Sequence, residues 1–178
     1  PILCKLLALY HEANRPADVL ALLDQAPFWG AKDLKELCME TVQVGDNSEY
    51  VGYLTASALA SAGRTTEALP IVEELLENSG SYDPAYELLI QIAPDTAMAK
   101  LDELIARDPF EERPLIWKAK QLVKSGNLEE AEKCARQAIA IDPTDGEQGP
   151  SRRLRAYATL GEIREARGDK KEADFLKG

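Results

Sequence analysis

Histidine and cysteine are scarce in this chain of 178 residues. His11 is the only histidine, and the three cysteines (Cys4, Cys38 and Cys134) are far apart, with no C-x-x-C pair. An odd number of cysteines at this spacing argues against a disulfide framework and against a zinc site. Each cysteine lies in an apolar helical context, where free Cys acts as a small core residue. We therefore expect structural cysteines, which mildly favours a reducing compartment such as the cytoplasm.

Sequence motifs for catalysis are also missing. The sequence contains no Gly-rich phosphate loop, no HExxH and no GxSxG. Acidic pairs such as Glu73-Glu74 and Glu129-Glu130 fit solvated helix faces and first-turn charges that favour the helix dipole. We expect His11 to be a surface or partly buried side chain. The segment is predicted to have no enzyme activity, no metal and no cofactor.

Long apolar runs are absent, since none approaches the roughly 20 residues that a membrane-spanning helix needs. The first 13 residues are amphipathic and lack both a basic n-region and a small-residue cleavage site, so they do not form a signal peptide. The chain has no initiator Met and begins within a helical pattern. We expect it to be a piece of a longer protein, so a targeting signal could lie outside it.

Positive charge is in short supply overall, with a net charge of −10 and a pI near 4.7. This balance disfavours the broad phosphate neutralisation that general nucleic-acid binding requires. Residues 1–110 contain 7 Lys/Arg and 18 Asp/Glu, whereas residues 111–178 contain 14 and 13. The two halves therefore favour different ligands, unless the acidic residues simply form a solvated outer surface.

Apolar residues recur at helical spacing twice within residues 112–145. The positions i, i+4 and i+7 are Leu115, Ala119 and Leu122, then Ala131, Ala135 and Ala138. This pattern predicts two amphipathic helices with a Gly-Asn turn between them. Such a pair cannot bury both of its apolar faces alone, so we expect similar pairs on either side. No part of the chain has the pattern of a strand.

The same reading predicts a single all-α array of about eleven helices. Helix pairs are expected at about 1–27, 49–82, 83–111, 112–145 and 154–178, with an extra helix at about 31–43 and a polar loop at 146–153. Pro70 falls inside the second helix of its pair, where it predicts a kink or a late helix start. Asp83 and Asp95 are expected as helix N-caps.

Three turns share one sequence register. Gly63, Gly126 and Gly168 are each followed five residues later by alanine. Glycine tolerates the positive φ that often ends a helix, and alanine lets the next helix pack closely. Asn127 and Glu130 have the spacing of a capping box. With the aromatic-x-x-Leu-Gly pattern at 157–161, these features make the chain resemble tetratricopeptide-repeat proteins, whose unit is a helix–turn–helix of about 34 residues.

The resemblance implies a right-handed α-solenoid of antiparallel helix pairs. It also implies a protein–protein interaction scaffold, in which the first helices line a concave groove for a peptide or partner protein. Projecting that helix face onto this chain gives ten candidate partner-binding residues: Tyr50, Tyr53, Ser57, Arg113, Trp117, Lys120, Lys124, Arg155, Thr159 and Glu162. The lysine-and-asparagine clamp that some members use for a C-terminal carboxylate is not expected, because Tyr53, Ser57, Glu87 and Leu88 stand at those places.

Trp117 is the most informative of these candidates. It lies off the Leu115–Ala119–Leu122 stripe, with Lys118 and Lys120 nearby. An aromatic residue beside cations suits a binding anchor. The alternative is that Trp117 packs against the adjacent unit. The basic residues around it could likewise bind an acidic ligand or only balance nearby acids.

The sequence departs from the regular pattern in places and leaves other functions open. The first unit has Asn14 for the turn glycine, and unit 83–111 is short at its internal turn. The alternatives are an RNA-binding helical-repeat module, or a regulatory or oligomerisation segment of an enzyme encoded elsewhere in the parent chain. Exposed apolar ends of the array could also pair with one another.

Overall fold

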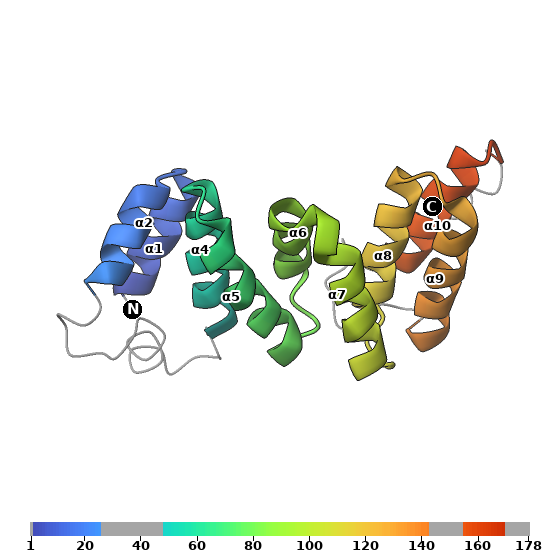
Figure 1. The fold of residues 1–178 in the computed structure, drawn as a ribbon, viewed down its shortest axis with the longest axis horizontal. Helices are drawn as coiled ribbons and strands as arrows, with labels where there is room; N and C mark the ends of the chain where they lie inside the picture. Colours follow the sequence, from blue (N-terminus) through green and yellow to red (C-terminus); the bar gives the residue numbers. More distant parts are fainter. Residues whose placement is uncertain (1, 26–47, 143–154, 170–178) are drawn as a thin grey trace. The chain divides into compact units, whose positions relative to one another are not determined.

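The fold is entirely helical in the part of the chain that the computed structural model describes, residues 2–25, 48–142 and 155–169 (Figure 1). These residues form α1 (Ile2–Glu12), α2 (Pro16–Asp24), α4 (Ser48–Ser61), α5 (Thr65–Asn78), α6 (Asp83–Ile92), α7 (Pro94–Arg107), α8 (Arg113–Lys124), α9 (Leu128–Ile141) and α10 (Arg155–Ala166). The prediction of an all-α fold of adjacent helix pairs is confirmed. The expected helix at 31–43, the loop at 146–153 and the helix after 169 lie outside the described residues.

Four turns have the same backbone conformation. φ is positive at Asn14 (52°), Gly63 (77°), Gly126 (79°) and Gly168 (86°). In each turn the next residue donates its N–H to a carbonyl five positions back, as Asn127 does to Leu122 at 2.9 Å. This is the Schellman motif, which the turn glycines predict. Asparagine tolerates the left-handed region better than most other residues, so Asn14 closes the first pair in the same way.

The observed helix starts agree only in part with those predicted from the sequence. The Asn127 side chain accepts a hydrogen bond from the Glu130 N–H at 3.4 Å, which is one half of the predicted capping box. Asp83 and Asp95 were expected as N-caps, but α6 begins at Asp83 and α7 at Pro94. Both expectations are wrong by at least one residue. The two carboxylates instead lie in the first helical turn, where the helix dipole favours negative charge.

Pro70 lies within α5 without delaying its start. The helix begins at Thr65 and continues to Asn78, so the expectation of a late start is wrong. Proline removes one N–H from the helix ladder and its ring needs space. The Pro70 side chain is exposed, which places the ring on the solvent side of the helix.

Contacts divide the chain into two compact units, residues 1–94 and residues 95–178. In the first unit, a core cluster joins α1, α2 and α4 through Leu7, Val19, Leu22, Val51, Leu54 and Ala58. The helix α4 contacts both α1 and α6. The first helices of successive pairs, α1, α4 and α6, are therefore neighbours in this unit.

The second unit has its own core around the predicted helix pair. The cluster consists of Leu115, Ile116, Ala119, Leu122, Ala131, Cys134, Ala135, Ala138, Ala156, Leu160 and Ile163. Met98 and Ile105 of α7 pack against it, and the ion pair Lys118–Asp102, at 2.5 Å, also joins α7 to α8. Cys134 is buried and free, as expected of a structural cysteine; the side chains of Cys4 and Cys38 lie outside the described residues.

Candidate functional site

A row of aromatic rings crosses the first helices of the first unit. His11 of α1 meets Tyr53 of α4 with ring centroids 5.8 Å apart and planes at 73°. Tyr53 meets Tyr82, which immediately precedes α6, at 5.8 Å and 64°. Both contacts have the edge-to-face geometry that aromatic pairs prefer. We call His11, Tyr53 and Tyr82 the aromatic row.

Burial and nearby carboxylates raise the pKa values of the tyrosines in this row. Burial raises the pKa of Tyr53, and the nearby Glu87 raises it further. Burial raises the pKa of Tyr82 to about 12, with smaller contributions from Tyr53, Tyr50 and Glu49. These phenols therefore stay neutral at ordinary pH.

A third tyrosine lies close to the row. The exposed Tyr50 of α4 has its pKa raised by burial and by Glu12. Three carboxylates thus contribute to the raised pKa values of the three phenols, and α1, α4 and α6 supply one each. We call Glu12, Glu49 and Glu87 the acidic rim.

A small cavity lies beside the row. Ser57, one helical turn after Tyr53, lines a cavity of about 80 Å³. Its lining residues come from the end of α1, the turn after it, the start of α2 and the second half of α4: His11, Asn14, Arg15, Pro16, Val19, Ser57, Ala58 and Ser61. The cation in this lining is already engaged, because Arg15 pairs with Asp18 at 2.8 Å and its guanidinium lies 4.9 Å from the Tyr10 ring centroid. The cavity is large enough for a few water molecules or the tip of a side chain.

The candidates in the second unit lie on α8 and α10, which contact each other. Lys120 places its Nζ 4.5 Å from the Trp117 ring centroid, within the range of a cation–π interaction. Trp117 is half-buried, and Lys124 and Glu162 are exposed. Arg155 is half-buried, and burial lowers the pKa of its guanidinium.

Two candidates have little surface to offer a ligand. Arg113 is 4% exposed and pairs with Glu111 at 2.8 Å and with Glu112 at 3.6 Å. Thr159 is 1% exposed. A buried side chain cannot contact a partner unless the helix moves, so neither residue belongs to the surface considered below.

Two residues of the aromatic row were not among the sequence candidates. His11 was expected only as a surface or partly buried residue, and it is indeed half-buried. Tyr82 precedes the helix whose face was projected, so a helical projection passes over it. The sequence signal that could have found Tyr82 is its place next to the Asp83-Pro84 helix start.

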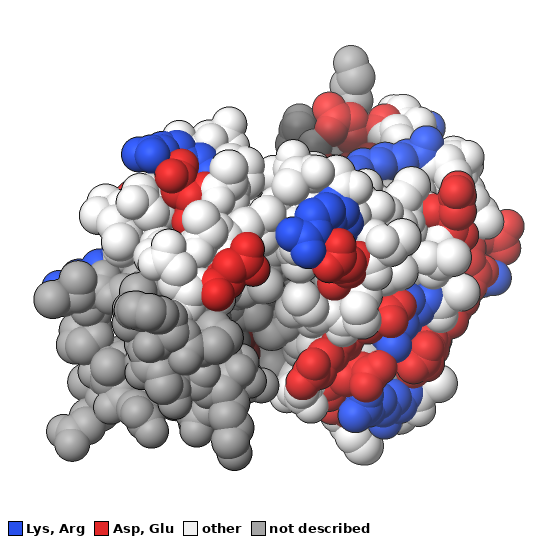
Figure 2. Space-filling view, turned by 60° about the vertical axis from the view of Figure 1, so that its left-hand side comes forward, with Lys and Arg blue, Asp and Glu red and all other residues white. Residues whose placement is uncertain are grey.

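Surface charges elsewhere are largely interspersed. On the face that Figure 2 shows, basic and acidic side chains lie beside one another among uncharged residues. Short-range pairs such as Arg64–Glu67 at 2.7 Å and Lys100–Glu103 at 3.1 Å fit this picture. Among the described residues there is no group of three or more His, Cys, Asp or Glu able to hold a metal ion. Nor does any described helix have the length and apolarity to cross a membrane.

A family model described as tetratricopeptide repeat matches residues 113–145, which include α8 and α9. Comparison with curated proteins finds no match for the chain. Among solved structures, MamA from Desulfovibrio magneticus RS-1 is similar at 18% identity and a TM-score of 0.52, covering 98% of this chain and 89% of that one.

Two further solved structures are similar to this chain. A thermophilic tetratricopeptide-repeat protein of Thermus thermophilus has 18% identity and a TM-score of 0.53, with 98% of this chain and 86% of that one covered. A tetratricopeptide-repeat protein of Parabacteroides merdae has 12% identity and a TM-score of 0.55, with 98% and 62% covered. Residues 113–145 are therefore a tetratricopeptide repeat, and the chain has the fold of tetratricopeptide-repeat proteins.

Proposed function

We propose that this chain is a scaffold that binds a peptide or a segment of a partner protein on the surface of its first helices. The tetratricopeptide repeat is generally a protein-interaction module, and the matched family model is not that of an enzyme. The observation that carries the proposal is the aromatic row, which joins α1, α4 and the start of α6.

The row has the chemistry of a binding surface. Tyrosine combines a large apolar ring with a polar end and is enriched among the residues that dominate binding energy. Tyr50 is 36% exposed, and Tyr53 and Tyr82 are only half-buried. A ligand could therefore bury more of each ring. The small cavity beside His11 adds Ser57 and Ser61 as hydrogen-bonding groups.

The second unit supports the proposal through α8. Trp117, Lys120 and Lys124 follow each other at helical spacing, so they share one face of the helix. Trp117 is the aromatic anchor on this face, and the two lysines can pair with acidic groups of a ligand. The two units thus offer surfaces of different charge.

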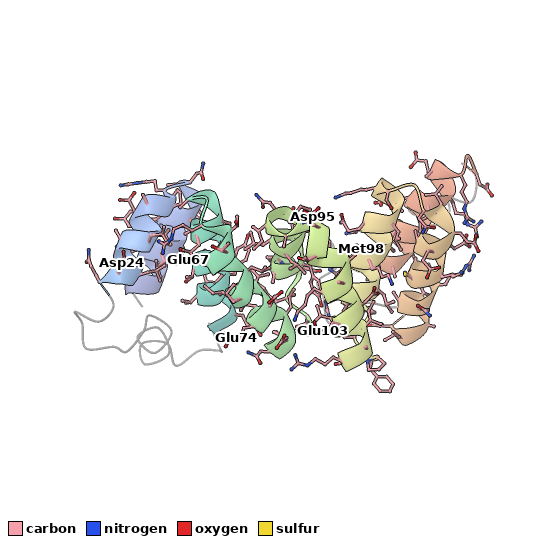
Figure 3. The ribbon with its side chains drawn as sticks, viewed as in Figure 1. Asp24, Glu67, Glu74, Asp95, Met98 and Glu103 are labelled. Carbon is pink, nitrogen blue, oxygen red and sulfur yellow. The ribbon has the colours of Figure 1, made fainter. Side chains whose placement is uncertain are left out.

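Peptide display on the immobilised 178-residue chain tests the proposal. Selected peptides should lose at least tenfold in affinity on Tyr53→Ala or on Trp117→Ala. Two matched controls, Glu74→Ala on α5 and Gln137→Ala on α9, change exposed residues of second helices and should leave affinity within twofold (Figure 3 shows Glu74 on α5). Circular dichroism of each variant checks its helicity.

The opposite results are equally clear. If no peptide is selected, or if the control variants weaken binding as much as the first-helix variants, the first helices do not form the binding surface. Filter binding with single-stranded RNA over a salt titration tests the nucleic-acid alternative. Salt-sensitive affinity in the micromolar range or better would contradict the proposal.

A further inference from the structure

We infer that the aromatic row, with its acidic rim, is a site for the cationic side chains of an arginine- or lysine-bearing peptide. The inference rests on the proposed function and names the chemistry of the ligand for the first unit. It combines two features: the ring contacts of His11 with Tyr53 and of Tyr53 with Tyr82, and the carboxylates of the acidic rim, which come from α1, α4 and α6.

The rings supply one part of the attraction. The face of an aromatic ring is electron-rich and attracts a cation that lies within about 6 Å of its centroid. Successive rings of the row meet at 73° and 64°, so each plane is turned steeply from the next. This chain already makes such contacts elsewhere, with Arg15 at 4.9 Å from the Tyr10 ring and Lys120 at 4.5 Å from the Trp117 ring. A ligand cation at the row would adopt the same geometry.

The acidic rim supplies the other part. Glu12 and Glu87 are exposed and Glu49 is half-buried, so all three can reach a ligand. Hydrogen bonds from a guanidinium or ammonium group to a carboxylate are about twice as strong as neutral ones. One peptide cation could therefore contact a ring face and a carboxylate at once.

In the part of the first unit that the structure describes, the basic residues are Lys5, Arg15 and Arg64, and Arg15 already pairs with Asp18 at 2.8 Å. Residues 48–94 contain one basic residue, Arg64, against seven acidic ones. Arg64, which immediately precedes α5, already pairs with Glu67 at 2.7 Å. On α1, Lys5 lies two helical turns before Glu12, which is about 10 Å along the helix.

Other ligands fit the site less well. An acidic peptide would bring like charges to the rim, and such juxtaposition is unfavourable. An apolar peptide would cover the rim carboxylates without offering them partners, which is also unfavourable. Charge complementarity therefore favours a cationic ligand.

The test uses the 178-residue chain and a fluorescein-labelled peptide of four Gly-Ser-Arg repeats, with fluorescence anisotropy as the measurement. A matched peptide carries citrulline in place of arginine, which keeps the shape and removes the charge. A third peptide carries glutamate. The arginine peptide should bind at least tenfold more tightly than the citrulline peptide, and the glutamate peptide should not bind.

Protein variants locate the binding. The double variant Glu12→Gln/Glu87→Gln should lower the affinity for the arginine peptide at least fivefold. The control Glu73→Gln/Glu74→Gln makes the same change in net charge on α5 and should stay within twofold. Tyr53→Phe keeps the ring and should retain binding. Tyr53→Leu keeps an apolar side chain without a ring and should lower the affinity at least fivefold.

Each outcome decides the matter. Equal loss in the two double variants would mean that net charge alone attracts the peptide, and would overturn the inference. Equal affinity for the arginine and citrulline peptides would overturn it as well, while display peptides that depend on Tyr53 would still support the proposed function. If neither display peptides nor the arginine peptide bind, both the inference and the proposed function fail.

Discussion

The carboxylate of Glu132 on α9 accepts a hydrogen bond at 2.5 Å from the guanidinium of Arg164 on α10, 32 residues later in the chain. Arg167 of the segment that follows α10 and Arg136 of α9 bind the same carboxylate. The Glu132 side chain is only 14% exposed. One carboxylate thus holds three guanidinium groups and ties the matched repeat to the helix that follows it.

Replacing Glu132 by glutamine should destabilise the fold. The change removes the negative charge and leaves Arg164 and Arg167 close to each other. We expect a loss of roughly 1.5–3 kcal/mol in the free energy of unfolding, the range for hydrogen bonds to charged groups. Urea denaturation measures it. The control Glu129→Gln removes a carboxylate that is 82% exposed and pairs only loosely with Lys133 at 3.7 Å, so its effect should be small. Equal losses would show that the cluster contributes nothing special.

The contribution of Glu132 should depend on pH. Burial raises the pKa of this carboxyl, but the hydrogen bond from Arg136 and the charges of Arg164 and Arg167 outweigh burial, so the pKa lies below its ordinary 4.5. A lowered carboxyl pKa stabilises the fold above the ordinary value, and the stabilisation is lost as the pH falls through the folded-state pKa. The stability difference between the native chain and Glu132→Gln should therefore be constant near neutral pH and shrink below pH 4.5. A difference that stayed constant into strong acid would contradict the pairing.

Alanine at Gly126 should cost about 1 kcal/mol in unfolding free energy through backbone strain. φ is 79° there, and a Cβ at this position would meet no atom within 4 Å. Crowding is therefore not the cause. Asparagine tolerates the left-handed region better than alanine, so Gly126→Asn should lower the unfolding free energy less than Gly126→Ala does. Asn14 adopts this conformation in the native chain, with φ 52°. Chemical denaturation of the two variants separates strain from packing, and equal costs would argue against strain.

Trp117→Ala should weaken the binding of a partner to the second unit without loss of helicity. The ring is half-buried and already contacts the Lys120 ammonium group, which suits a contact surface more than a core. Thermal unfolding and partner affinity are measured together. For comparison, Leu122→Ala truncates a residue of the core cluster and should cost about 2–5 kcal/mol. If Trp117→Ala lowers the melting temperature as much as Leu122→Ala does, Trp117 is a core residue.

The helices and their turns could be predicted because they depend on local pattern. Positive φ at Gly126 follows from its place after an amphipathic run, and the burial of Ala131 and Ala138 follows from their spacing. These features need no knowledge of the neighbouring pairs.

The aromatic row could not be found this way. His11, Tyr53 and Tyr82 are separated by 42 and 29 residues, and they meet only because α1, α4 and α6 pack side by side. Periodicity within one helix carries no information about that packing. The burial of Arg113 was missed for a related reason. Its enclosure depends on Glu111 and Glu112, which lie before the helix and outside any helical projection.

The four Schellman turns have a consequence for engineering. Each turn satisfies its own backbone groups, with bonds such as Arg64 N–H to the Leu59 carbonyl at 2.8 Å. The conformation therefore needs only one residue that accepts a positive φ, and the side chains around it are free to differ. The α1–α2, α4–α5 and α8–α9 pairs thus share one kind of turn. Turn segments should be exchangeable between these pairs. A designer could therefore transfer one binding face into another helical array without redesigning its turns.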